Sequence, residues 1–478
     1  MIVTRRHAAA ALSAPMPTSA TWSEAKPRRH VGPVGPIIAA SLAIGFLSAV
    51  FLVALPFAGA QENVISGAVL LAFGLGWGLL AVLSMRWTEQ PQRWAALPAL
   101  VFLVAGATLL AWPGSVKNVL LEWAWPPVLL ALVAWMVRRS RKELRSRARA
   151  WLLYPVFAVL ACAAIGATCE SALEVRDRAA FPMPGRLVDV GGRRLHLSCT
   201  GADAPTVVLL PGAGDVSPGW GWIVRTVARS TRVCVWDRAG RGWSDDAPRP
   251  QDGVALATDL HTLLDRAQIA GPVVLAGHSF GGLSALEYAA RYPDEVAGMV
   301  LLDATSTEMF TRLRRYPAIY ESYRRVSALF PSLARLGVGR IVYRSGFDSL
   351  PAQSQREELA FWSTARQARS VRDEWSQAPA LMRQARALRS LGARPLIVVT
   401  AMREAQEGWM PLQNDLARLS SNSEHRVLSN STHSALTANA GDARASSQAI
   451  VDVVRAVRTS QPLAARLPAT YSRVTGRR

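Results

Sequence analysis

The chain has 478 residues, and half of them are hydrophobic, while only 18% are charged. This length is enough for two or three domains. The formal net charge is +20, and all basic residues except Lys26, Lys117 and Lys142 are arginines. Nucleic-acid-binding modules interleave basic and aromatic residues on one face. No such pattern occurs in this sequence, so its composition argues against a nucleic-acid partner.

The first third of the chain predicts a membrane region. Residues 1–36 carry five basic side chains among Ala, Ser, Thr and Pro, which predicts a disordered basic tail. A transmembrane helix needs about 20 apolar residues to cross the hydrocarbon core. Segments of this kind predict a transmembrane region over residues 37–174, with spans at about 37–60, 63–85, 95–112, 118–137 and 151–170.

The basic residues predict how these segments are oriented. The N-terminal tail, Arg86 with Arg93, and the seven basic residues of 138–149 would all lie on one side of the membrane, the cytoplasmic side. A cleaved signal peptide is too short to explain five segments. Five spans place the rest of the chain outside the cytoplasm. The fourth segment is the weakest because it contains Glu122 and two prolines, and the orientation reverses if it does not cross.

The remaining chain predicts an α/β domain. A charged linker is expected at 175–185, and a loose basic tail at 459–478. Between them, residues 186–458 alternate short apolar strands with amphipathic helices, which predicts a mostly parallel sheet covered on both faces. Residues 305–392 interrupt this alternation with a helical, aromatic-rich insertion.

One motif organises this domain. An apolar strand ends at Gly277, Ser279 follows, and Gly281 with Gly282 opens a helix. This is Gly-x-Ser-x-Gly in a strand–turn–helix context, the pattern of a nucleophile elbow. The glycines let strand and helix approach closely, while the serine takes a strained backbone position. The motif predicts that Ser279 is a nucleophile.

Two further motifs occur in a fixed order around this elbow. They are Leu-Pro-Gly-Ala-Gly at 210–214 and Asp-Arg-Ala-Gly-Arg-Gly-Trp-Ser at 237–244. Together with the elbow, they make residues 186–457 similar to the α/β-hydrolase superfamily. The resemblance implies a mostly parallel eight-stranded sheet, with residues 305–392 as a helical cap that sets substrate choice. The membrane region lies outside the resemblance.

A serine hydroxyl needs an adjacent base to become a good nucleophile. His433 follows the final expected strand in a polar loop, which is where the superfamily keeps its base, and the order serine then histidine agrees. The other histidines, including His278 beside the nucleophile, are expected to be structural.

The acid that orients the histidine is less clear. Glu404 fits by position, because it follows the strand after the insertion. Asp303 fits a second known arrangement, at the end of the preceding strand, where a buried carboxylate needs a partner. We favour Asp303, with Glu404 as the alternative and with Glu407 and Asp415 as weaker candidates.

The resemblance also implies an oxyanion hole built from two backbone N–H groups. Phe280, the residue after the nucleophile, should supply one. Ala213 should supply the other, with Gly214 as an alternative, although the family often has His-Gly where this chain has Pro211-Gly212. The motif at 237–244 is expected to be structural rather than catalytic.

Cys199 and Cys234 lie on strands that are neighbours in the family's strand order. A disulfide is therefore geometrically possible and would suit an external compartment, while two buried thiols are the alternative. The aromatic residues of the cap suggest an apolar acyl or ring pocket, or simple packing. The sequence shows no metal-ligand cluster and no dinucleotide motif, so no metal or cofactor is expected.

These features predict a membrane-anchored serine hydrolase that cleaves a carboxylic ester, thioester or amide through an acyl-enzyme on Ser279. The expected partners are a small or lipid-like ester and the lipid bilayer. An aspartate nucleophile would have implied dehalogenase or epoxide-hydrolase chemistry, which Ser279 argues against. Two alternatives stay open: acyl transfer to a lipid or cell-envelope acceptor, and a non-catalytic sensor or scaffold.

Overall fold

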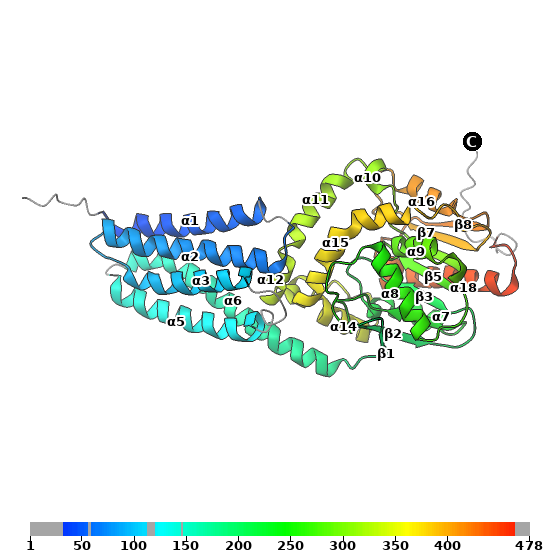
Figure 1. Ribbon diagram of the computed structural model, residues 1–478, viewed down its shortest axis with the longest axis horizontal. Helices are drawn as coiled ribbons and strands as arrows, with labels where there is room; N and C mark the ends of the chain where they lie inside the picture. The colour runs from blue at the N-terminus through cyan, green and yellow to red at the C-terminus, as the bar shows by residue number, and fades with distance from the viewer. Residues whose placement is uncertain (1–31, 56–58, 112–119, 145–146, 464–478) are drawn as a thin grey trace, which may run out of the picture.

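The computed structural model describes residues 32–55, 59–111, 120–144 and 147–463 (Figure 1). The expected N-terminal tail and most of the expected C-terminal tail lie outside these residues. The described chain forms an elongated helical bundle and an α/β domain placed end to end, with a group of helices between them (Figure 1).

The bundle consists of helices that run alternately toward and away from the α/β domain (Figure 1). Four helical segments are long and apolar enough to cross a membrane: Val34–Ala54, Glu62–Trp87, Arg93–Ala111 and Trp151–Ala180. The helix at the fourth expected span lies against α6, and its last turns are charged. The helices are α1 (Val34–Ala54), α2 (Glu62–Trp87), η1 (Arg93–Ala95) with α3 (Ala96–Ala111), η2 (Leu120–Ala124) with α5 (Trp125–Glu143), and α6 (Arg147–Ala180).

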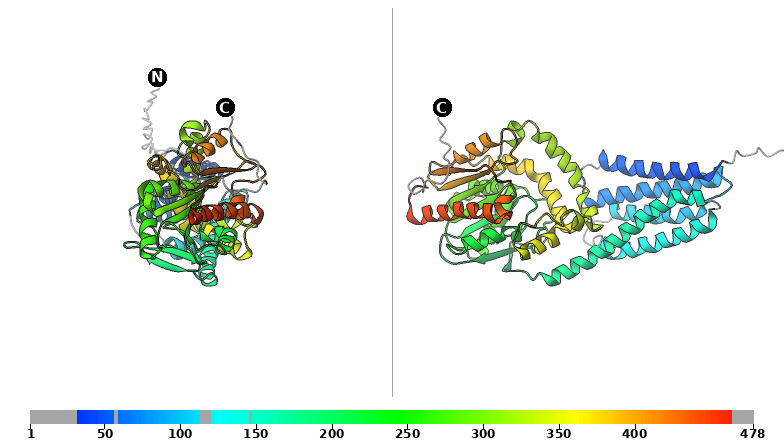
Figure 2. Two further views of the ribbon diagram at one scale, coloured as in Figure 1. Left: turned by 90° about the vertical axis from the view of Figure 1, so that its right-hand side faces the viewer. Right: turned by 180° about the vertical axis from the view of Figure 1, so that it is seen from behind.

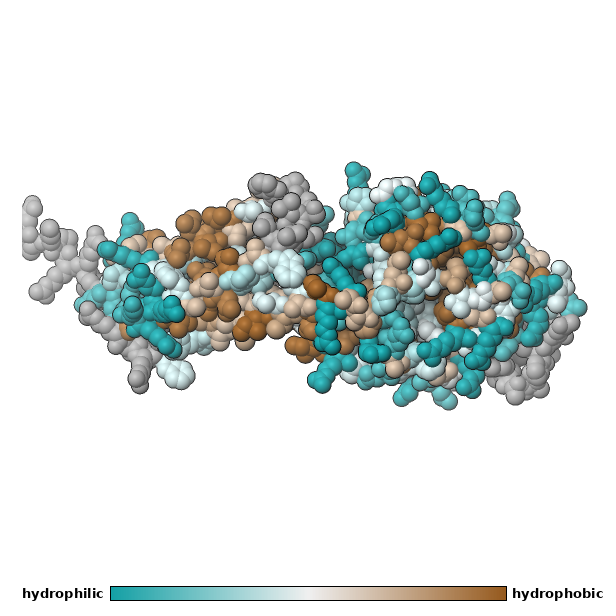
Figure 3. All heavy atoms as spheres, turned by 90° about the horizontal axis from the view of Figure 1, so that it is seen from below, coloured by the Kyte–Doolittle hydropathy of each residue, from teal (hydrophilic) through white to brown (hydrophobic). Residues whose placement is uncertain are grey.

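Close helix contacts hold the bundle together. At the crossing of α1 and α2, a Cβ on Gly76 would lie 3.1 Å from the Cα of Gly45 and 2.9 Å from the carbonyl oxygen of Ser41. Small residues of this kind let membrane helices pack closely. The ring of Trp77 stacks on Phe157 of α6, with 6.2 Å between centroids. Seen from below, the side of the bundle is mostly apolar between two polar ends (Figure 3).

α6 connects the bundle to the α/β domain without a break (Figure 2). It continues to Ala180, so the linker expected at 175–185 is reduced to residues 181–185. The physical reason is that no glycine or proline occurs between Gly166 and Pro182, and Glu174 pairs with Arg178 one turn later.

The α/β domain contains the predicted mostly parallel eight-stranded sheet, in the order β1-β2-β4-β3-β5-β6-β7-β8. β2 pairs antiparallel with β1 and β4, and the remaining neighbours are parallel. The strands are β1 (Arg186–Asp189), β2 (Arg194–Thr200), β3 (Val207–Leu210), β4 (Val233–Trp236), β5 (Val273–His278), β6 (Val296–Leu302), β7 (Leu396–Ala401) and β8 (Ser423–Leu428).

Helices cover both faces of this sheet, which explains why its central strands are continuously apolar. One core contains side chains of α8 (Gly253–Arg266) and α9 (Phe280–Arg291), and the other contains those of α7 (Gly221–Val227) and α18 (Ala440–Thr459). The shorter elements are η3 (Ser217–Trp220), η4 (Pro293–Glu295), α16 (Trp409–Ala417) and α17 (Ala435–Ala438).

The insertion between β6 and β7 forms a helical cap between the sheet and the bundle (Figures 1 and 2). Its position follows from the carboxyl ends of the parallel strands, where such insertions begin. The cap helices are α10 (Met309–Arg312), α11 (Tyr316–Ser327), α12 (Phe330–Arg335), α13 (Val338–Val342), α14 (Ala352–Trp362) and α15 (Ala365–Ala385).

Candidate active site

Ser279 lies on the turn between β5 and α9 with φ 54° and ψ −121°, which is a strained conformation for a residue with a side chain. Its backbone is held by the carbonyl of Leu302, 3.0 Å from Ser279 N, and by the N–H of Thr305, 3.0 Å from Ser279 O. A Cβ on Gly281 would lie 1.9 Å from the carbonyl oxygen of Leu210, so only glycine fits there. The turn therefore has the geometry of a nucleophile elbow.

His433 and Asp303 lie together at the carboxyl edge of the sheet. His433 Nδ1 is 2.6 Å from Asp303 Oδ2, and Asp303 is 3% exposed. The other oxygen, Oδ1, accepts the indole N–H of Trp409 at 2.7 Å and the N–H of Ala401 at 3.3 Å. These donors hold the carboxylate so that Oδ2 is aimed at the imidazole, which is the arrangement that orients a catalytic base.

The other candidate acids lie away from His433. Glu404 and Glu407 are exposed. Asp415 is paired with Arg312 and Arg418 on the surface. The geometry thus favours Asp303 among the four carboxylates that the sequence left open.

The hydroxyl of Ser279 and the imidazole of His433 share no hydrogen bond within the described chain. Bonds of this kind are often long in enzymes without substrate and shorten in the reacting complex. Ser279 and His433 are both partly exposed, so both can reach a ligand.

The loop after β3 leaves one N–H group for an oxyanion. Pro211 has none, Gly212 N is bound to Asp215 Oδ2 at 3.1 Å, and Gly214 N is bound to Glu374 Oε2 at 3.0 Å. No acceptor for the N–H of Ala213 is found among the described residues, and the same is true of Phe280. The geometry therefore favours Ala213 over Gly214 as the partner of Phe280 in an oxyanion hole.

Buried charges fix this loop. Arg238 donates to the carbonyl oxygens of Pro211 and Gly212, and it pairs with Glu374 of the cap at 2.9 Å. Arg241 pairs with the same carboxylate at 2.7 Å. Burial, with the neighbouring Arg241, lowers the pKa of Arg238 to about 10, so its guanidinium stays charged at neutral pH.

The motif at 237–244 has a structural role in this arrangement. The Asp237 carboxylate accepts hydrogen bonds from Ser217 and lies 2.8 Å from His196 Nδ1, and both His196 and Asp237 are buried. Burial lowers the pKa of His196, but the bond to Asp237 and its charge outweigh burial and raise that pKa above its ordinary value.

His278 is one residue that the sequence did not assign to the site. Its Nε2 lies 3.0 Å from the carbonyl oxygen of His433, and the two rings are 4.6 Å apart. It therefore supports the loop that carries the candidate base. Its position next to Ser279 in the sequence was the available signal.

The comparisons with known proteins agree with the fold of the α/β domain. Residues 205–437 match the family model of the alpha/beta hydrolase fold. This part of the chain belongs to the α/β-hydrolase superfamily.

Among curated relatives of this chain, an uncharacterized protein of Schizosaccharomyces pombe is 28% identical over 291 residues, 53% of each chain. A putative carbamate hydrolase, RutD of Pseudomonas savastanoi, is 37% identical over 110 residues, which are 23% of this chain and 42% of that protein. The chain thus spans about half or less of the length of these two relatives. A solved structure, a putative lipase of Acinetobacter baumannii, is 20% identical with a TM-score of 0.48, covering 61% of this chain and 97% of that one.

Cys199 and Cys234 are joined by a disulfide between β2 and β4. No group of three His, Cys, Asp or Glu side chains that could hold a metal ion is found in the described chain. A polar cavity lies where bundle, cap and the loop at 237–244 meet, and its lining residues do not include Ser279 or His433.

Proposed function

We propose that the chain is a membrane-anchored serine hydrolase that cleaves a carboxylic ester through an acyl-enzyme on Ser279. The single observation that carries this proposal is the hydrogen bond between His433 Nδ1 and the buried Asp303, formed at the sheet edge where the strained elbow presents Ser279. Thioesters and amides share the same chemistry.

The residues suggest how each step would proceed. His433 Nε2 accepts the hydroxyl proton of Ser279 while Oγ attacks the carbonyl carbon. The N–H groups of Ala213 and Phe280 stabilise the resulting oxyanion. The bond to the leaving alcohol then breaks as His433 returns the proton. Water, activated by the same imidazole, releases the acid and restores the free enzyme.

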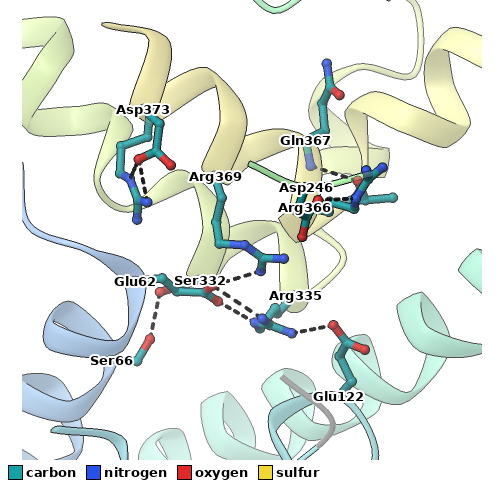
Figure 4. A network of polar contacts seen from close by, with 12 residues as sticks. Glu62, Ser66, Glu122, Asp246, Ser332, Arg335, Arg366, Gln367, Arg369 and Asp373 are labelled. Atoms are coloured by element: carbon teal, nitrogen blue, oxygen red, sulfur yellow. Dashed lines mark hydrogen bonds and ion pairs between the residues drawn. The ribbon is translucent and has the colours of Figure 1, made fainter. Parts of the chain in front are cut away.

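We also propose that the hydrolase domain lies outside the cytoplasm. Glu62 at the start of α2 and Glu122 of η2, which leads into α5, contact the cap (Figure 4). The basic ends of α2 and α5 therefore lie at the opposite end of the bundle. Arginine-rich segments favour the cytoplasmic side. The disulfide between Cys199 and Cys234 supports an oxidising compartment.

The test uses the full chain purified in detergent or nanodiscs. A fluorophosphonate should label the parent protein at Ser279 and should not label Ser279→Ala. A panel of esters, thioesters, amides and carbamates should then be hydrolysed by the parent only, with free acid as the product. Transfer of the acyl group to an added alcohol in preference to water would favour acyl transfer instead. A folded parent protein that neither labels nor turns over any substrate would refute the proposal.

A further inference from the structure

The cap carries an apolar face on the helices nearest to the bundle. Within residues 181–463, exposed large hydrophobic side chains occur only on this part of the cap. Such clustering is unusual on a water-exposed surface and marks an interaction surface. The residues of this apolar cap face are Ile319 and Val326 of α11, Leu333 of α12, Leu336 of the next turn, and Ile341 and Val342 of α13.

This face lies at the level of the membrane helices. Ser332 of α12 is hydrogen-bonded at 2.8 Å to Ser66, which is four residues inside α2. Leu336 packs on Gly166, where a Cβ would lie 2.4 Å from the Leu336 carbonyl oxygen, and Gly166 is four residues inside the acidic end of α6 that begins at Glu170. Four residues correspond to about 6 Å along a helix. The cap therefore reaches past the polar ends of α2 and α6.

The charged groups at this depth are neutralised in pairs (Figure 4). Arg335 lies between Glu62 and Glu122, and it is 2.9 Å from the latter. Glu62 also pairs with Arg369 at 3.1 Å. Ionised side chains in a low-dielectric region are stable only when each has a partner of opposite charge.

A second arginine docks the cap in the same way. Arg340 lies 2.7 Å from Glu170 and 2.8 Å from Asp177, both on α6. Arg344, which follows α13, is exposed beside the apolar residues. An apolar face bordered by arginine matches the composition of segments that lie in the membrane interface.

The apolar cap face also continues the lipid-facing surface of the bundle. The end of α1 contacts α11, because Arg325 donates to the carbonyl oxygen of Ala54 at 3.3 Å. Phe51 and Leu55 are exposed there. Seen from below, apolar surface extends from the bundle to its junction with the cap (Figure 3).

We infer that the apolar cap face is immersed in the outer lipid interface and that the hydrolase takes a membrane-resident acyl ester from that leaflet. The second half rests on the proposed function. The reason is that α15 of the same cap contacts the oxyanion loop at Gly214 through Gln367 and Glu374. The cap therefore lies between the candidate site and the membrane. A substrate held in the bilayer would meet the cap before it met water.

The first test measures lipid contact without any reaction. Ile341→Cys is made in the full chain with Cys162→Ser and Cys169→Ser, labelled with a small fluorophore, and placed in nanodiscs that contain lipid with a shallow nitroxide. The control label is on Thr459→Cys, which is exposed at the end of α18. Quenching at 341 should exceed quenching at 459 several-fold. Equal quenching at the two sites would overturn the inference.

The second test separates substrate delivery from catalysis. The double variant Ile341→Glu with Val342→Glu is compared with the parent and with Ser421→Glu plus Thr459→Glu, a control pair of exposed residues. Hydrolysis of a long-chain ester in the bilayer should fall roughly tenfold in the first variant only, since charge expels the face from lipid. Hydrolysis of a short, water-soluble ester should not change.

The possible outcomes are distinct. If the label at 341 is quenched but the bilayer substrate is hydrolysed normally by the variant, delivery from the leaflet is overturned and lipid contact stands. If the parent hydrolyses neither ester, the proposed function and the leaflet substrate fail together, and the quenching still decides lipid contact.

Discussion

Replacing Asp303 by asparagine should lower the turnover of any ester by about 10⁴-fold while leaving the fold intact. Such a factor corresponds to about 5.5 kcal/mol of transition-state stabilisation. The two carboxylate oxygens of Asp303 have different partners. Oδ1 accepts N–H groups from Trp409 and Ala401, and Oδ2 faces His433 Nδ1 at 2.6 Å.

These partners determine how the asparagine amide must lie. Its oxygen has to remain with the two N–H donors, because an NH2 group there would face other donors in a buried site. The amide NH2 therefore points at His433 Nδ1 and converts that nitrogen to an acceptor. The proton then resides on Nε2, which can no longer accept a proton from Ser279. The substitution should thus fix the wrong tautomer.

The assay is the kcat of the full chain on a water-soluble ester, with Glu404→Gln as the matched control. Glu404 is exposed and should change kcat less than twofold, a near-neutral effect typical of surface sites. The thermal transition of each variant checks that it is folded. A loss in Glu404→Gln that exceeded the loss in Asp303→Asn would refute the assignment of the acid, as would full activity in Asp303→Asn.

Three further predictions concern stability. Glu62→Ala should destabilise the docked cap by about 3 kcal/mol, because it removes the carboxylate that pairs with Arg369 and one of the two that pair with the buried Arg335. Glu143→Ala removes an exposed pair and should cost about 0.5 kcal/mol at most, and thermal denaturation in detergent compares the two variants. Burial, with Asp215 and Asp237 nearby, raises the pKa of Glu358 well above its usual range. The folded state then binds that proton more tightly than the unfolded state, so the stability of the parent falls as pH rises above about 4.3. Glu358→Gln lacks this proton, so its thermal midpoint should rise relative to that of the parent between pH 5 and pH 8. An unchanged difference across this range would contradict the burial argument. Replacing both Cys199 and Cys234 by serine should cost about 3–4 kcal/mol for a separation of 35 residues, measured as a lower denaturation midpoint, and no loss would mean that the two sulfurs are not bonded in the folded protein.

Local patterns were sufficient to predict the sheet, the elbow and the position of His433. The elbow can be recognised in the sequence because its glycines must lie within a few residues of Ser279; a Cβ at position 281, for example, would clash with Leu210. The identity of the acid could not be predicted in this way. It depends on which strand end lies under the loop after β8, and both Asp303 and Glu404 follow strands that satisfy the same pattern.

The contacts between cap and bundle could not be predicted from sequence patterns. Glu62 lies in a short polar stretch and Glu122 in the weakest apolar segment, and each resembles an ordinary interfacial residue. Arg335 is one of many arginines in the cap. Arg335 pairs with Glu62, 273 positions away, and with Glu122, 213 positions away. Such pairs form only in the tertiary structure, so no local sequence pattern predicts them.

These contacts bear on how the candidate site is held. Arg369 of α15 pairs with Glu62 at the start of α2, while Gln367 and Glu374 of the same helix bind the carbonyl oxygen and the N–H of Gly214. One helix thus connects the bundle to the residue beside Ala213.

If a flexible linker alone joined the bundle to the α/β domain, the bundle would not affect the position of the loop at Ala213. Here α6 runs unbroken to Ala180, and Arg340 fixes the cap to α6 at two carboxylates. The hydrolase domain is therefore held at both its N-terminal connection and its cap. Since oxyanion stabilisation depends on donors placed in advance, rigid docking of the cap on the bundle contributes to the geometry around Ala213 as well as to anchoring.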